Sequence, residues 1–188
     1  MARARRIIKE VAELRLLADP IKLRIFEALR DAPASPHELA LRFGKKPTAL
    51  YHHFARLTAA RLIEVATERQ RRGVVERLYR PAARQLVVDH ALARRGQASR
   101  SVRAVLAAAS AILQVTGEDL RAAVVDPSQP LADRSRSEIG TIVVHVTPAN
   151  ARRLMRRLRA LIVDANRVDG SGKERVRLTL ALVPVAAV

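Results

Sequence analysis

The chain contains no cysteine and no tryptophan, and aromatic residues make up only 3% of its 188 positions. Without cysteine it can form neither a disulfide bond nor a thiolate metal site, and this absence fits a reducing compartment. With so few aromatic side chains, a hydrophobic core must be built from Leu, Val, Ile and Ala. The abundance of Ala and Arg favours helices, because both are good helix formers.

Long apolar runs are also missing. The longest ones, such as AVLAAASAIL, fall well short of the ~20 residues that span a bilayer. The N-terminus MARARRIIKEVAELRLLADP is basic, but charged residues interrupt its apolar ones, so it lacks the continuous apolar region of a signal peptide. The sequence therefore predicts a soluble, cytoplasmic protein without a membrane partner.

Signals for catalysis and metal binding are scarce. The chain has no Gly-rich phosphate loop, no Ser/His/Asp spacing and no paired-carboxylate motif. Adjacent residues on a helix point about 100° apart, so His52 and His53 cannot easily share one metal ion. Asp89 and His90 are the only possible start of a carboxylate–imidazole site. We expect no enzymatic activity, no metal and no cofactor. The five histidines are His37, His52, His53, His90 and His145.

The charge of the chain is strongly positive, with 35 Lys and Arg against 18 Asp and Glu and a net charge of +17. Such an excess indicates a polyanionic partner, which could be nucleic acid, an acidic membrane surface or an acidic protein. Codon bias toward Arg could raise the basic count without any function. Residues 1–96 hold 21 basic and 10 acidic residues, whereas residues 97–188 hold 14 and 8. This asymmetry favours nucleic-acid contact by the first half.

Apolar periodicity and capping residues predict four helices, in segments 7–17, 18–33, 34–44 and 45–62. Asp19 is expected to cap the second helix. Ser35 and Glu38 are expected to form the capping turn of the third, and Gly44 to end it. The following segment, IEVATERQRRGVVERLYRP, alternates apolar and polar residues around a basic centre, which predicts a β-hairpin. This order of elements is that of a winged helix-turn-helix.

The fourth predicted helix has two distinct faces. Its apolar face, which should be buried, consists of Leu50, Phe54 and Leu57. Its polar face consists of Thr48, Tyr51, His52 and Arg56. A helix that enters the major groove N-terminus first presents such side chains to base edges. Lys45 and Lys46 lie at the positive helix end and are candidate phosphate anchors. A merely solvated helix face is the alternative, and His53 is expected to pack toward the core.

The predicted hairpin carries a basic wing, which is formed by Arg69, Gln70, Arg71, Arg72 and Arg77. Such a wing can follow the phosphates or enter a narrow minor groove, which attracts arginine. Within it, Arg69, Arg71 and Arg72 are the candidate DNA contacts. An exposed, solvated turn is the alternative interpretation for this segment considered alone.

The segments LADPIKLRIF, ELA and ALYHHFARLTAARLI resemble the opening, middle and recognition helices of ArsR-type winged helix-turn-helix regulators. LYHHF is also similar to PadR-like relatives. The resemblance covers about residues 7–82 and implies DNA-binding transcription factors that are usually homodimers. It also implies recognition-helix contacts at Thr48, Ala49, Tyr51 and His52. Two departures are the missing cysteine metal site and Arg61, which stands where the pattern has Gly.

The second half of the chain begins with a predicted long helix, SRSVRAVLAAASAILQVTGEDLRAAVV. A helix-turn-helix normally needs two half-sites for useful affinity, so this helix is most simply a dimer interface. After a loop at residues 126–140, the strand TIVVHV, an Arg-rich helix and the strand RVRLTLALVPV are expected. This strand–helix–strand unit could sense an effector, add a dimerisation layer or support the core. Its Arg-rich helix could be solvated, or could contact nucleic acid or an acidic partner.

The sequence as a whole predicts an α+β, mainly helical chain. We expect a winged helix-turn-helix DNA-binding domain in residues 1–96 and a dimerisation or effector-sensing α/β domain in residues 97–188. The expected function is sequence-specific regulation of transcription by a homodimeric repressor on double-stranded DNA. A nonspecific or architectural DNA-binding protein and a protein-interaction module on the same scaffold are the alternatives.

Overall fold

The computed structural model describes residues 3–71, 73–89, 98–125, 144–165 and 177–181, together with residues 92 and 167. The chain packs as two compact units, residues 1–115 and 116–188. The domain boundary expected at residues 96 and 97 stays a prediction. Helices and strands are both present in the described ranges and helix predominates, which confirms the predicted α+β, mainly helical class. None of the helices in these ranges is both long enough and apolar enough to cross a membrane.

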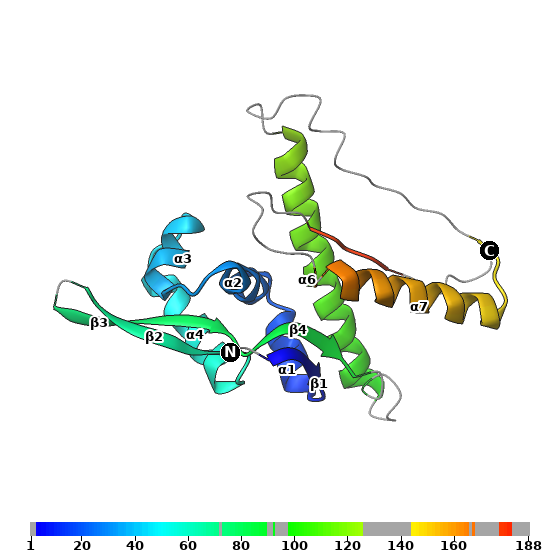
Figure 1. Ribbon diagram of the computed structural model, residues 1–188, viewed down its shortest axis with the longest axis horizontal. Helices are drawn as coiled ribbons and strands as arrows, with labels where there is room; N and C mark the ends of the chain where they lie inside the picture. Colours follow the sequence, from blue (N-terminus) through cyan, green and yellow to red (C-terminus); the bar gives the residue numbers. More distant parts are fainter. Residues whose placement is uncertain are drawn as a thin grey trace. The chain divides into compact units, whose positions relative to one another are not determined.

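The first unit has the element order of a winged helix-turn-helix (Figure 1). Its elements are β1 (Arg3–Ile8), α1 (Val11–Leu17), α2 (Pro20–Asp31), α3 (Pro36–Arg42), α4 (Thr48–Ala59), β2 (Ile63–Arg71), β3 (Val74–Pro81) and β4 (Ala83–Val88). A long helix, α6 (Ala98–Val125), begins in this unit and continues into the second. The antiparallel β2–β3 hairpin is the predicted wing. The backbone of Ala34, just before α3, pairs with Tyr79 of β3 and joins the wing to the helices.

The predicted helix starts are confirmed at atomic detail. The Asp19 carboxylate accepts hydrogen bonds from the backbone N–H groups of Ile21 and Lys22, at 2.9 and 3.3 Å. At α3, Ser35 Oγ accepts the N–H of Glu38 at 3.2 Å, and the Glu38 carboxylate accepts the N–H of Ser35 at 2.8 Å. This reciprocal capping box satisfies two N–H groups that would otherwise have no partner within the helix.

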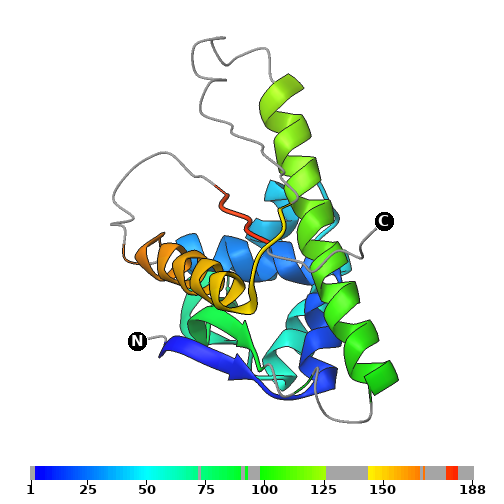
Figure 2. The same cartoon turned by 90° about the vertical axis from the view of Figure 1, so that its right-hand side faces the viewer.

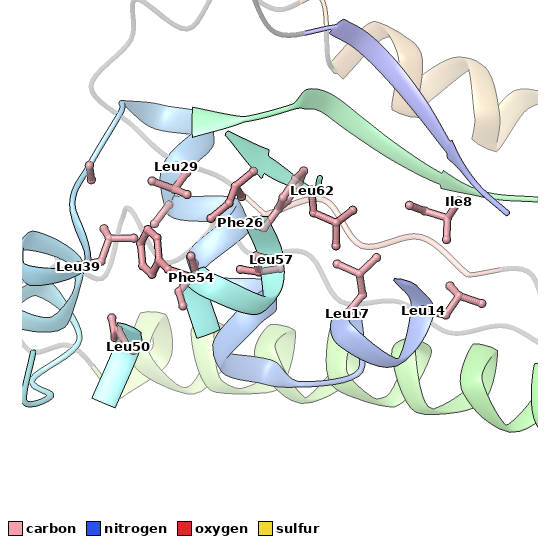
Figure 3. Close-up of a cluster of buried hydrophobic side chains, with 14 of the residues drawn as sticks. Ile8, Leu14, Leu17, Phe26, Leu29, Leu39, Leu50, Phe54, Leu57 and Leu62 are labelled. Atoms are coloured by element: carbon pink, nitrogen blue, oxygen red, sulfur yellow. The ribbon is translucent and has the colours of Figure 1, made fainter. Parts of the chain in front are cut away.

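A single hydrophobic cluster holds the first unit together and fixes the orientation of α4 (Figure 3). Leu50, Phe54 and Leu57 are 0, 2 and 0% exposed, which confirms the predicted buried face. The Phe54 ring meets the ring of Tyr79 on β3 edge-on, with centroids 5.1 Å apart. The cluster also includes Ile8, Leu14, Leu17, Phe26, Leu29, Leu39 and Leu62. Because its apolar face is bound into this core, α4 must present its opposite face to solvent.

The segment predicted as the first helix begins as a strand. The predicted helix at residues 7–17 starts only at Val11, and Ile7 and Ile8 belong to β1. A further strand that the sequence did not predict, β4, follows Pro81. β1 and β4 pair in parallel, with Arg3 opposite Ala83 and Ile8 opposite Val88, and they lie side by side in Figures 1 and 2. Ile8 is fully buried by this arrangement.

Helix α4 ends in a Schellman motif, a paired backbone hydrogen-bond pattern that normally places glycine in the left-handed region. The N–H of Leu62 donates to the carbonyl of Leu57 at 2.9 Å, and the N–H of Arg61 donates to that of Thr58 at 2.8 Å. Arg61 occupies the left-handed position with φ of 54° and is the only non-glycine residue with positive φ in the described ranges. The guanidinium of Arg6 donates to the carbonyls of Ala60 and Arg61 and pairs with Glu13. Arg6 thus supports a turn that lacks its usual glycine.

Replacing Arg61 by glycine should raise the free energy of unfolding by roughly 0.5–1 kcal/mol. The left-handed conformation costs a side-chain-bearing residue about 1–2 kcal/mol, and the greater freedom of glycine in the unfolded chain returns part of that gain. Urea denaturation followed by circular dichroism measures the change. The matched control is Gly44→Ala in the equivalent motif that ends α3, where φ is 62°, and this variant should be destabilised. A less stable Arg61→Gly protein would contradict the prediction.

In the second unit, the predicted Arg-rich helix is confirmed as α7 (Pro148–Ala165). Thr147 caps this helix, since its Oγ1 accepts the N–H of Asn150 at 3.2 Å. The last part of α6 contacts residues 177–181 through Asp119 and Arg177, whose Oδ2 and Nε are 2.6 Å apart. Residues 144–146 and 177–181 were expected in strands, but these described residues are not in strand structure. The other residues of these two expected strands and the loop at 126–140 lie outside the described residues.

Candidate nucleic-acid interface

The exposed face of α4 carries every residue of this helix that the sequence proposed as a DNA contact. All five side chains are exposed, and Tyr51, the largest of them, has 55% of its surface accessible. The five residues are Thr48, Ala49, Tyr51, His52 and Arg56. The structure therefore gives one helix a rigid apolar side and an accessible side of donors, acceptors and one cation. Such a helix is suited to contact base edges in a major groove.

The approach to α4 is short and positively charged. Helix α3 ends in a Schellman motif at Gly44, where the N–H of Lys45 donates to the carbonyl of Ala40 at 2.8 Å. Lys45 and Lys46 follow directly and are exposed. Pro47 is the N-cap of α4 and supplies no side-chain hydrogen bond. The first N–H groups of the helix, two lysines and the positive end of the helix dipole therefore lie together, an arrangement that favours a phosphate.

The adjacent histidines separate as expected. His52 is exposed, whereas His53 is only 7% exposed, and its Nδ1 lies 3.6 Å from Oδ2 of Asp19. Lys22, also buried, is paired with the same carboxylate. Burial lowers the pKa of His53, and the neighbouring positive charge of Lys22 lowers it further, while Asp19 opposes the shift. Burial would raise the pKa of Asp19, but its hydrogen bond and charge pairing with Lys22 lower it overall. His53 is therefore a neutral packing residue that joins α4 to the start of α2.

The lowered pKa of His53 predicts a loss of stability in mild acid. Since the folded-state pKa lies below the ordinary value of 6.5, the unfolded chain binds the proton more readily. The contribution of neutral His53 to the free energy of unfolding is complete above the ordinary pKa of 6.5. It is lost as the pH falls from 6.5 toward the lower pKa of the folded state. Urea unfolding midpoints between about pH 7.5 and pH 5.5 should therefore decrease, and less steeply in His53→Gln than in the native chain. His145→Gln, a change at an exposed histidine, is the control and should leave the slope unchanged.

The wing is a ladder of cross-strand ion pairs. Arg77 Nε lies 2.9 Å from Glu68, and Arg80 Nη2 lies 2.8 Å from Glu64. These partners are directly opposite each other in the β2–β3 register. Among the arginines described in β2 and β3, each has a glutamate partner; the four are Arg69, Arg71, Arg77 and Arg80. Arg72 lies outside the described residues, and Gln70 is exposed. The described charges of the hairpin are therefore largely balanced.

Arg69 connects the wing to the helix-turn-helix. Its guanidinium lies 2.6 Å from Glu38 of α3 and 2.7 Å from Glu76 of β3. Ser35 Oγ, fully buried, donates to the other oxygen of Glu76 at 2.6 Å. This hydroxyl and Arg69 together outweigh desolvation and lower the pKa of Glu76. The assignment of Arg69 and Arg71 as DNA contacts stays a prediction, but the contacts of Arg69 give it a positioning role that charge counting missed.

Metal ligands do not converge in the part of the chain that the structure describes. No group of three His, Cys, Asp or Glu side chains is close enough there to hold an ion. His90, the histidine of the Asp89–His90 pair noted in the sequence, lies outside that part.

A family model described as a helix-turn-helix domain matches residues 17–66, from the end of α1 to the start of β2. No curated protein matches the chain at a meaningful level of similarity. The match includes α2, α3 and α4, the elements that build the candidate interface. The chain therefore carries a helix-turn-helix domain, and this supports its assignment to the DNA-binding transcriptional regulators.

Proposed function

We propose that the protein is a homodimeric, sequence-specific regulator of transcription that represses by occupying its operator in double-stranded DNA. Its winged helix-turn-helix would make it an ArsR-type regulator with PadR-like features in the recognition helix. The main observation behind the proposal is that α4 has two faces, an apolar face buried in the core and a polar face exposed along the helix. The second unit supplies dimerisation or responds to an effector.

The side chains on the exposed face of α4 have complementary roles in this proposal. Arg56 can donate two hydrogen bonds to guanine, and Thr48 can contact a thymine methyl group or a hydrogen-bonding edge. Tyr51 and His52 can bond bases or phosphates. Lys45 and Lys46 bind the backbone and set the register of the helix, since phosphate contacts position a protein without specifying sequence.

The homodimer is supported by a second apolar surface on α6. Ala104, Ala108, Ala111 and Val115 face the interior of the chain and are buried. On the nearly opposite side, the α6 stripe consists of Val102, Leu106, Ala109 and Leu113, all exposed. Its spacing of four, three and four residues is that of a helix seam that packs against another helix. A second copy of this chain would cover the stripe and would also supply the second half-site contact that helix-turn-helix proteins use.

The decisive experiment begins with selection of a binding sequence from a random duplex pool. Fluorescence anisotropy then compares the selected duplex with a scrambled one at two salt concentrations. A regulator should prefer the selected duplex by more than ~10³-fold. An architectural protein would show almost no preference and a steep salt dependence, because counterion release would supply its affinity. The absence of binding to any duplex would favour the protein-interaction module.

Substituting alanine for His52 or Tyr51 tests the base-contacting face directly. Each change should cost about 1–3 kcal/mol on the selected duplex and relax specificity at one or two base positions. Binding to the scrambled duplex should change much less. His145→Ala, which removes an exposed histidine from the second unit, is the matched control. Equal losses on both duplexes would contradict the assignment of these residues to base contacts.

A further inference from the structure

A cationic notch lies beside the turn that leads into α4. It is a cavity of about 320 Å³ between the start of α2 and the end of α3. Its lining consists of Ile21, Arg24, Arg42, Phe43 and Lys45. Three of these five side chains are positively charged and none is acidic. Only Lys45 was singled out from the sequence, because the other two cations belong to helices that sequence patterning assigned to the scaffold.

The notch is built on fixed elements. Ile21 and Phe43 pack against the hydrophobic core and form a rigid apolar floor. The Ile21 N–H is bound by the Asp19 cap, so the first turn of α2 is held in place. On the other side, the Schellman motif at Gly44 reverses the chain directly after Phe43. This reversal places Arg42 and Lys45, which flank the turn, around the same cavity.

We propose that this notch binds a phosphate group. Two guanidinium groups and an ammonium group match a doubly charged tetrahedral oxyanion better than a singly charged carboxylate, and arginine binds phosphate oxygens in a forked geometry. The volume is at the lower end for small-molecule sites, which fits a phosphate with a small attached group rather than a large ligand.

The phosphate can come from two sources that share this chemistry. Lys45 lies three residues before the first residue of α4, so the backbone of a bound duplex can reach the notch. In that case Arg24 and Arg42 increase the affinity for DNA duplexes of any sequence. This DNA source of the phosphate rests on the proposed function. Alternatively, a small phosphorylated molecule occupies the notch and competes with or assists DNA binding.

The test uses the full chain with Arg24→Gln, Arg42→Gln and the double variant. The control is Arg84→Gln, which removes the same charge from an exposed position on β4. Arg42 is exposed, so its variant should fold normally, which circular dichroism verifies. If DNA is the source, each single variant should bind selected and scrambled duplexes roughly tenfold more weakly. The slope of log affinity against log salt should become shallower by about 1 per variant.

If a small molecule is the source, inorganic pyrophosphate should shift the backbone amide NMR signals of residues 42–45 saturably. These shifts should vanish in the double variant and persist in Arg84→Gln, with duplex binding unchanged in both. The pyrophosphate titration does not depend on DNA binding. If the native protein showed no sequence preference, the proposed function would be refuted, but the phosphate site could still be tested with pyrophosphate. The phosphate site is overturned if the notch variants match Arg84→Gln in duplex affinity, salt slope and pyrophosphate response.

Discussion

Replacement of Phe54 by alanine is expected to remove about 3–5 kcal/mol from the free energy of unfolding and to abolish DNA binding with it. Phe54 is 2% exposed and belongs to the hydrophobic cluster drawn in Figure 3. Its ring also contacts Tyr79 on β3, so the substitution loosens α4 from the core and from the wing together. A small domain has only about 5–15 kcal/mol of stability in total. Urea denaturation and anisotropy with the selected duplex measure the two effects.

The control for this experiment lies one turn earlier on the same helix. Tyr51 is also aromatic but is 55% exposed, so Tyr51→Ala should change stability by less than about 0.5 kcal/mol. Tyr51→Ala should nevertheless reduce specific DNA binding. Comparison of the two variants therefore distinguishes the buried face of α4, which determines stability, from its exposed face, which is proposed to contact DNA. A Phe54→Ala protein with the unfolding midpoint of the native chain would refute the assignment of α4 as a core-anchored helix.

The features that were predicted correctly from sequence depend on residues close together in the chain. The caps at Asp19 and Ser35 use backbone N–H groups two or three positions away. The buried face of α4 follows from helical periodicity, since Phe54 and Leu57 recur at helical spacing after Leu50. Local rules suffice wherever the partner is a neighbour in the sequence.

Strands β1 and β4 could not be predicted in this way. Their pairing joins residues 3–8 to residues 83–88, and nothing in either segment identifies the other. Ile7 and Ile8 fit the apolar period of the helix that follows as well as they fit a strand. The role of Arg6 could not be predicted either, because its hydrogen bonds go to the carbonyls of Ala60 and Arg61. These residues are more than 50 positions away in the sequence and meet Arg6 only in the folded chain. Long-range contacts decide both outcomes.

The wing shows how charge counting alone can mislead about a site. The sequence displays Arg69 as part of a basic run, and its exposed position is correct. Its glutamate partners are seven residues ahead in the hairpin and 31 residues behind on α3. The first partnership follows from hairpin register, which a sequence gives only approximately. The second needs the packing of α3 against the wing, so only the structure reveals the positioning role.

A charge on the α6 stripe should have the largest effect on DNA binding of any change that leaves the fold intact. Leu106 and Leu113 are 60 and 59% exposed, so Leu106→Glu with Leu113→Glu should cost a single subunit little stability. In the proposed dimer the same glutamates would be buried against their symmetry partners, and burial of like charges without counterions is strongly unfavourable. The double variant should therefore be a folded monomer by analytical ultracentrifugation.

Loss of the dimer should weaken operator binding by about 10²–10⁴-fold, because the second half-site contact is no longer intramolecular. Binding to an isolated half-site should be nearly unchanged, since α4 and its neighbours are untouched. Ala107→Glu adds a charge on an exposed part of α6 that points away from the stripe, and it should remain a dimer with native affinity. If the double variant stays dimeric, another surface joins the subunits. If the native chain is itself a monomer, the α6 stripe faces a different partner and operator recognition must rely on one half-site.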